Sequence, residues 1–191
     1  MPTPPPAPVD DRAADAVLRR WRPEDGPDLL TAVRASPDLD RQLPASVADG
    51  PRGSTEVAGR LAAWGPRDHH LAVVVDGRVV GSVGIGAAEQ RHGTAWLSYW
   101  LTTGARGLGL ATRALATAAV VAFDRLDLFR LELGHRTENA PSCGVASRAG
   151  FAAEGVERQK LRYGDRRYDV ETHARLRTDP VPDVPLLRVD L

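Results

Sequence analysis

A strand, a glycine-rich loop and a helix follow one another between residues 95 and 125, and this unit constrains the fold more than any other segment. Residues 95–101 are apolar on both faces of a period-2 strand, which indicates a central strand covered on both sides. Glycines at 104–109 follow directly, and from Leu110 onward apolar residues recur at helical spacing. Because glycine lets the backbone approach a ligand and a helix N-terminus offers unpaired N–H groups, the unit predicts a phosphate or pyrophosphate site. The alternative is that the glycines serve only a tight turn from strand to helix.

The segments around this unit predict one α/β domain with a mixed sheet. The Asp76–Gly77 dipeptide between two apolar runs suits a two-residue hairpin turn. Expected strands are 17–21, 71–75, 79–85, 95–101 and 128–133, with two further candidates around 163–167 and 170–176. Expected helices are 27–35, 54–64, 110–122 and 139–149.

Proline is concentrated at both ends of the chain. Five of the 15 prolines lie within the first eight residues and three within the last twelve. Because proline fixes φ and lacks an N–H donor, these ends do not suit helices or central strands. We therefore expect a flexible tail at 1–12, a single domain at 13–178 and an irregular tail at 179–191.

Charge and cysteine content exclude several classes of protein. Lys plus Arg and Asp plus Glu both number 25, which argues against binding nucleic acid or a membrane through bulk charge. The single cysteine, Cys143, excludes a disulfide framework and fits a cytoplasmic protein. We also expect no metal site, because that cysteine is alone and the His69–His70 pair has no evident partner ligands.

The glycine-rich loop resembles the pyrophosphate signature of the GNAT superfamily of acyl-coenzyme A-dependent N-acetyltransferases, Gln/Arg-x-x-Gly-x-Gly/Ala. The stretch Arg106-Gly107-Leu108-Gly109-Leu110-Ala111 matches each fixed position. Downstream, Asn139-Ala140-Pro141-Ser142 with Gly150-Phe151 and Glu154-Gly155 resembles a block of the branch that contains the Rim-type ribosomal-protein N-terminal acetyltransferases. The resemblance covers roughly residues 15–177. It implies the GNAT fold: a mixed sheet of about seven strands, about four helices, and splayed central strands that form the coenzyme A cleft.

The resemblance also implies roles for individual residues, with acetyl-CoA as the acyl donor. Loop amides and the Thr112 hydroxyl would hold the pyrophosphate, the end of the central strand would bind the pantetheine like an extra strand, and Asn139 would contact the same arm. Ser142 is the candidate proton donor to the leaving thiolate, or else a hydroxyl that only caps a helix. The implied coenzyme A-binding residues are Leu101, Thr102, Thr103, Arg106, Gly107, Leu108, Gly109, Leu110, Ala111, Thr112 and Asn139.

The implied reaction is direct attack of a neutral amine on the thioester, and the general base is not evident. Where Rim-type relatives have a candidate glutamate, this chain has Leu161. His135 is the candidate base because histidine is the side chain that ordinarily changes charge near neutral pH. The alternatives are a purely structural or surface histidine and deprotonation through water. An α-amine has a pKa of about 7.7–8.0 against about 10.4 for lysine, so a site without a strong base favours a protein or peptide N-terminus as acceptor.

The sequence is also compatible with other acceptors, another acyl donor and a non-catalytic function. A small-molecule amine such as an aminoglycoside or polyamine would favour an acidic cleft, with carboxylates from Asp38, Asp40, Asp49 and Glu56. A succinyl-CoA-using relative has the same fold. A non-catalytic acyl-CoA sensor would also keep the loop intact. Family analogy allows a homodimer.

Overall fold

The computed structural model describes residues 15–191, so the expected tail at 1–12 lies outside the described residues. Its strands are β1 Val17–Arg20, β2 His69–Val75, β3 Arg78–Glu89, β4 Thr94–Leu101, β5 Arg130–Arg136, β6 Ala152–Tyr163, β7 Arg166–Leu176 and β8 Arg188–Asp190. Its α-helices are α1 Gly26–Ala35, α2 Pro51–Ala62, α3 Leu110–Arg125 and α4 Ala140–Arg148, with short 3-10 helices at 23–25, 37–41, 45–47 and 103–105.

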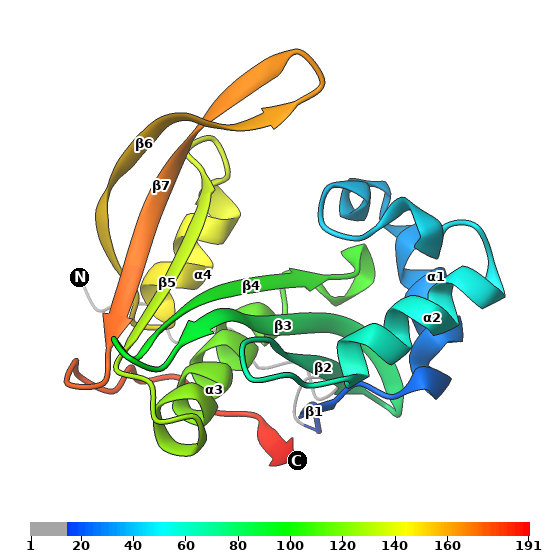
Figure 1. Ribbon diagram of the computed structural model, residues 1–191, viewed down its shortest axis with the longest axis horizontal. Helices are drawn as coiled ribbons and strands as arrows, with labels where there is room; N and C mark the ends of the chain where they lie inside the picture. Colours follow the sequence, from blue (N-terminus) through cyan, green and yellow to red (C-terminus); the bar gives the residue numbers. More distant parts are fainter. Residues whose placement is uncertain (1–14) are drawn as a thin grey trace, which may run out of the picture.

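The strands form one mixed sheet in the order β6-β7-β5-β4-β3-β2-β1-β8 (Figure 1). Most neighbours are antiparallel, whereas β4–β5 and β1–β8 are parallel. The β2–β3 hairpin turns at Asp76 and Gly77, both with positive φ (50° and 74°), as a primed two-residue turn requires. This confirms the predicted hairpin and the predicted α/β class with a mixed sheet.

Helices cover both faces of the sheet, and the alternation of side chains along β2 shows how. Leu71 and Val73 are buried in the larger core, with α3 and α4. Ala72 and Val74 point to the other face and are buried with α1 and α2. Successive side chains of a strand point to opposite faces, so an uninterrupted apolar run is what such a two-sided strand requires.

The two central parallel strands pair over a short stretch and then separate. The β4–β5 ladder contains three residue pairs, from Thr94↔Arg130 to Trp96↔Glu132. Beyond it, β4 continues on β3 and β5 continues on β7. In Figure 1 the sheet accordingly opens into two arms, with β5, β6, β7 and α4 on one and the rest of the sheet on the other. The predicted splay is present.

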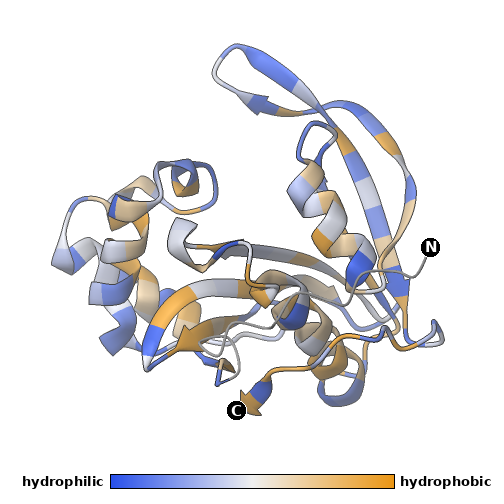
Figure 2. Cartoon of the chain, turned by 180° about the vertical axis from the view of Figure 1, so that it is seen from behind, coloured by the Kyte–Doolittle hydropathy of each residue, from blue (hydrophilic) through white to orange (hydrophobic). Residues whose placement is uncertain are grey.

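The outer arm ends in a long hairpin. Strands β6 and β7 project beyond the rest of the sheet (Figure 1), and the distal part of this hairpin is mainly hydrophilic (Figure 2). The turn lies at Gly164, with φ of 58°, and Asp165. The sequence expectation of a strand over 163–167 was therefore wrong, because this stretch contains the reversal between two longer strands.

The expected irregular tail at 179–191 contains a strand. Strand β8 pairs in parallel with β1, and the chain that leads to it crosses α3. The Leu187 N–H donates to Thr117 Oγ1 at 2.9 Å, and the Leu187 side chain is 4% exposed within the larger core. The prolines at 180, 182 and 185 precede the strand, so they shape an extended approach without occupying ladder positions.

Helix α2 also begins earlier than expected. It starts at Pro51, a residue favoured in the first turn because its fixed φ suits a helix and its missing N–H costs no bond there. Ser54, the expected start, is buried inside the helix and its hydroxyl donates to Pro51 O at 3.0 Å. Among residues 15–191, no helix is long and apolar enough to cross a membrane.

The docked C-terminus predicts unequal effects of two adjacent leucines. Replacing Leu187 by Ala removes a fully packed side chain and should lower the free energy of unfolding by about 2–4 kcal/mol. Leu186 is 46% exposed, so Leu186→Ala is the matched control and should cost less than about 1 kcal/mol. Urea denaturation measures both. Equal losses would contradict the docking of this segment on α3.

Candidate active site

The loop between β4 and α3 has a backbone shape that two glycines permit. Gly107 and Gly109 have φ of +80° and +73°, in the left-handed region where side chains other than glycine are strained. An added Cβ at either position would meet nothing within 4 Å. The need for glycine is therefore conformational, and the surroundings of the loop are open.

This loop presents a run of free backbone donors. Among the described residues, the N–H groups of 107–112 have no hydrogen-bond acceptor; the first bonded amide of α3 is that of Arg113, which donates to Gly109 O at 3.1 Å. These donors lie at the N-terminus of α3, where the helix dipole adds positive potential. The arrangement is suited to a phosphate or pyrophosphate group.

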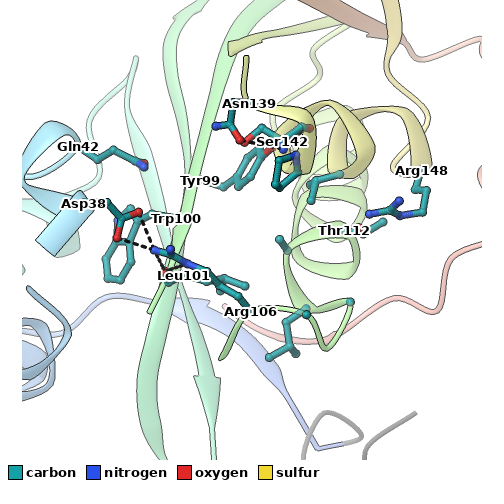
Figure 3. Close-up of a pocket in the computed structure, with 16 residues that line it drawn as sticks. Asp38, Gln42, Tyr99, Trp100, Leu101, Arg106, Thr112, Asn139, Ser142 and Arg148 are labelled. Atoms are coloured by element: carbon teal, nitrogen blue, oxygen red, sulfur yellow. Dashed lines mark hydrogen bonds and ion pairs between the residues drawn. The ribbon is translucent and has the colours of Figure 1, made fainter. Parts of the chain in front are cut away.

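A cavity of about 410 Å³ lies against these donors (Figure 3). Most of the expected loop residues line it, as do Leu101 and Asn139. Leu108 does not line the cavity; its side chain packs against the larger core. Across the cavity stand Pro141, Ser142 and Val145 of α4, so the space lies between the glycine-rich loop and the outer arm.

The Arg106 side chain holds the loop in place. Its Nε and Nη2 donate to Leu101 O at 3.0 and 2.9 Å, and Nη2 pairs with Asp38 Oδ2 at 2.9 Å. The guanidinium thereby ties the end of β4 to the 37–41 helix, as the dashed lines of Figure 3 show. Its charge is partly neutralised by Asp38, which leaves anion binding mainly to the backbone amides.

The end of β4 offers fewer free groups than expected. The Thr102 N–H donates to Val80 O at 2.8 Å and the Thr103 N–H donates to Ser36 Oγ at 2.9 Å. Since hydrogen-bonding direction alternates along an antiparallel strand, the backbone groups of Tyr99 and the N–H of Leu101 face the cleft instead, whereas Leu101 O accepts from Arg106.

Helix α4 brings Ser142 into the same cavity. Asn139 is its N-cap, with Oδ1 accepting from the Ser142 N–H at 3.3 Å. The Tyr99 hydroxyl donates to Ser142 O at 3.2 Å, and burial raises the pKa of Tyr99, which keeps this hydroxyl protonated. The N-cap of α4 is thus Asn139 and not Ser142. Within 15–191 nothing is hydrogen-bonded to Ser142 Oγ.

A second cavity of about 240 Å³ adjoins the first. It lies along the separated parts of β4 and β5, and its wall extends to the outer hairpin at Leu161 and Tyr163. The two cavities share Asp38, Gln42, Tyr99, Asn139 and Ser142. Ser142 therefore stands where the two spaces meet, which is the position required of a group that acts between two substrates.

His135 lies on the wall of the second cavity, but both of its ring nitrogens have partners in the protein. Nδ1 lies 3.0 Å from Arg136 O, and Nε2 lies 3.1 Å from His173 Nε2. The imidazole is 6% exposed. The structure thus does not hydrogen-bond His135 to Ser142; it places the ring in a separate polar cluster behind the cavity.

Arg148 is a lining residue that the sequence gave no reason to select. It lies in the last turn of α4, is exposed, and lines the first cavity on the side of Thr112 (Figure 3). A lone arginine on a short helix is ordinarily a solvated side chain. Only the packing of α4 opposite the α3 N-terminus adds this cation to an anion-binding cavity.

A splayed sheet with a cradle of free amides at the end of the central strand defines the GNAT class of acetyltransferases. The chain belongs to this family: the model of the acetyltransferase (GNAT) domain matches residues 15–152. This confirms the family resemblance of the two sequence motifs.

Curated relatives agree with this assignment. The chain is 30% identical over 102 residues to the "Probable N-acetyltransferase YjcK" of Bacillus subtilis, a match that covers 50% of this chain and 54% of YjcK. It is 26% identical over 157 residues to the "Uncharacterized N-acetyltransferase p20" of Bacillus licheniformis, covering 80% of this chain and 88% of p20. The chain thus spans about half the length of YjcK and most of p20.

Solved structures share the fold. Mycobacterium smegmatis RimJ, in complex with CoA-disulfide, has a TM-score of 0.75 and 26% identity, covering 84% of this chain and 81% of that one. RimL, a ribosomal L7/L12 alpha-N-protein acetyltransferase in complex with coenzyme A, has a TM-score of 0.76 and 22% identity, covering 88% and 96%. The GNAT fold predicted from the sequence is thereby confirmed.

The positive φ at Gly109 predicts how a small substitution alters ligand binding. Gly109→Ala fits sterically but strains the left-handed backbone by about 1–2 kcal/mol, so the loop should relax and the coenzyme A affinity should fall about tenfold. Gly59→Ala is the control, because Gly59 is helical and a Cβ there also meets nothing within 4 Å. Titration calorimetry with coenzyme A measures both. Unchanged affinity in Gly109→Ala would contradict the cradle.

Proposed function

We propose that the protein transfers an acetyl group from acetyl-CoA to a primary amine, and that the acceptor is the α-amine of a protein or peptide N-terminus. The assignment of acetyl-CoA as the acyl donor rests on one observation. The N–H groups of 107–112, which have no acceptor among the described residues, lie beside the open end of the splayed sheet. Among residues 15–191 these backbone donors at a helix N-terminus have no acceptor, which suits a pyrophosphate ligand, and the 410 Å³ cavity leads from them to Ser142.

We assign the two cavities to the two substrates of this reaction. With the pyrophosphate on the loop, the pantetheine arm fits along the cleft-facing backbone of Tyr99 and the N–H of Leu101, and the thioester reaches Ser142. The acceptor enters through the second cavity. The amine nitrogen attacks the thioester carbonyl, the C–N bond forms and the C–S bond breaks. A cleft-facing β4 amide stabilises the developing oxyanion, and Ser142 Oγ gives its proton to the leaving thiolate.

The charges around the acceptor cavity favour an α-amine over a lysine. The carboxylate that lines it, Asp38, is paired with Arg106, and His135 has both ring nitrogens occupied. No strong free base is thus present among the described lining residues. An amine that is already partly deprotonated near pH 7 does not depend on a general base, and α-amines meet this condition.

The same charges argue against a polycationic small molecule. Asp40, Asp49 and Glu56, the acids expected to form an acidic cleft with Asp38, do not line either cavity. The second cavity instead carries Arg41 and Arg136. RimL, which shares the fold, is described as an alpha-N-protein acetyltransferase, and this similarity supports a protein N-terminus as the acceptor. The predicted cytoplasmic location and the choice between acetyl and succinyl donors stay predictions.

A paired peptide assay tests the acceptor. One peptide carries a free N-terminus and no lysine, and its partner has a blocked N-terminus and one lysine. At pH 7 the neutral fraction of an α-amine exceeds that of lysine about 10²-fold, so thiol release should be about 10²-fold faster with the first peptide. Faster release with the lysine peptide would reject the α-amine assignment, and no release with any amine or with succinyl-CoA would favour a sensor.

Ser142→Ala tests the proton donor. Loss of a general acid should lower kcat about 10²-fold with little change in the KM for acetyl-CoA. Ser147→Ala is the matched control, because Ser147 is an exposed serine on the same helix and should leave kcat unchanged. Stopped assays of thiol release measure both variants. A Ser142→Ala enzyme with wild-type kcat would remove Ser142 from the mechanism.

A further inference from the structure

Four side chains that the proposed reaction does not use converge behind the acceptor cavity. His135 on β5, Glu171 and His173 on β7, and Cys143 on α4 each offer one potential ligand atom, and the four atoms lie within 4.8 Å of one another. His135 and Glu171 are directly opposed in the β5–β7 ladder, and His173 follows Glu171 by two residues on the same face. Cys143 closes the group from the first turn of α4.

The hydrogen bonds of the two imidazoles fix which nitrogens face the centre. His135 Nδ1 lies 3.0 Å from Arg136 O, and His173 Nδ1 lies 3.2 Å from Phe151 O. A carbonyl oxygen only accepts, so each Nδ1 donates to its carbonyl and Nε2 is the ring nitrogen that faces the other members of the cluster. A backbone carbonyl on the far nitrogen is also the usual way in which proteins orient a metal-binding histidine.

The inward-facing atoms of the cluster lie close together. The two Nε2 atoms are 3.1 Å apart, and Glu171 Oε2 lies 3.1 Å from one and 3.4 Å from the other. All three atoms are potential metal ligands, and a cation at the centre of the cluster contacts all of them together.

The spacing fits a tetrahedral ion. With metal–nitrogen and metal–oxygen bonds of about 2.0–2.1 Å, the ligand atoms of a tetrahedron lie about 3.3–3.4 Å apart, close to the three distances found. The Cys143 thiol completes the group, whose four ligand atoms lie within 4.8 Å of one another. Two imidazoles, one thiolate and one carboxylate are all ligands that Zn²⁺ accepts, and this mixture suits Zn²⁺ better than Mg²⁺ or Ca²⁺.

We propose that His135, Cys143, Glu171 and His173 form a Zn²⁺ site that links β5, β7 and the first turn of α4. Binding releases the thiol proton to solvent and leaves the ion held by a thiolate, a carboxylate and two neutral imidazoles. His135 and His173 are almost fully buried, while the Glu171 side chain is 29% exposed, so the ion enters from the Glu171 side. The site positions the turn that carries Ser142, one residue before Cys143.

Metal titration of the full chain tests the site. Protein freed of metal with a chelator is titrated with Zn²⁺ by calorimetry and with Co²⁺ by absorption spectroscopy. We expect one ion per chain, intense tetrahedral Co²⁺ bands, and a thiolate-to-cobalt charge-transfer band that Cys143→Ser abolishes. Zn²⁺ should also raise the Tm of the chelated protein.

One further variant and its control distinguish a metal ligand from a histidine that does not bind the ion. Removing even an outer partner of a metal site costs about 10–100-fold in affinity, so His173→Gln should cost at least about 100-fold. His92→Gln is the control, because His92 is exposed on the β3–β4 turn and should leave affinity unchanged. Retained coenzyme A binding shows that each variant is folded.

Two results would overturn the proposal. One is a wild-type protein that binds neither Zn²⁺ nor Co²⁺ at micromolar concentrations, which would identify the cluster as a proton-sharing network. The other is equal affinity in wild type and His173→Gln, which would place any bound metal elsewhere. Both readouts are independent of acetyl transfer, so loss of the proposed enzymatic activity would not affect them.

Discussion

The separation of β4 from β5 after three residue pairs is the constraint on which the rest of the site depends. A complete ladder would have used the strand edges internally and left no room between the arms. Because each strand keeps a partner on its other side, β3 for β4 and β7 for β5, the sheet stays intact while it opens. The gap exposes backbone donors and acceptors of β4, and α4 reaches across it. Both cavities follow from this one feature.

Anion recognition in this protein relies on backbone geometry more than on net charge. The chain carries equal numbers of acidic and basic residues. Its most suggestive cation, Arg106, is engaged by Leu101 O and Asp38 and so orders the loop. The positive potential comes from the α3 N-terminus, where two glycines with positive φ shape a loop whose amides have no acceptor among the described residues. Arg148 adds one flexible charge opposite.

The sequence predicted the loop, its following helix, the hairpin at Asp76 and Gly77, and the block around Asn139, because each depends on turn chemistry or periodicity within a few residues. It misjudged the C-terminal segment. Proline content indicated an irregular tail, yet the Leu187 amide bonds Thr117, 70 residues earlier, and β8 extends the sheet. The residues next to Leu187 in the sequence do not indicate that its side chain is buried against a helix far away in the chain. Arg148 escaped notice for the same reason.

By itself, the sequence determined the family, the glycine-rich loop and the presence of Ser142 at the start of a short helix. Each of these features depends on a motif of a few contiguous residues. Only the tertiary structure decided the partners of those groups. It paired Arg106 with Asp38, placed Ser142 between two cavities and turned His135 away toward His173. The physical reason is that side-chain chemistry is local but charge neutralisation and hydrogen bonding depend on contacts between elements far apart in the chain. His135 and His173, 38 residues apart, become one cluster only when β5 and β7 pair.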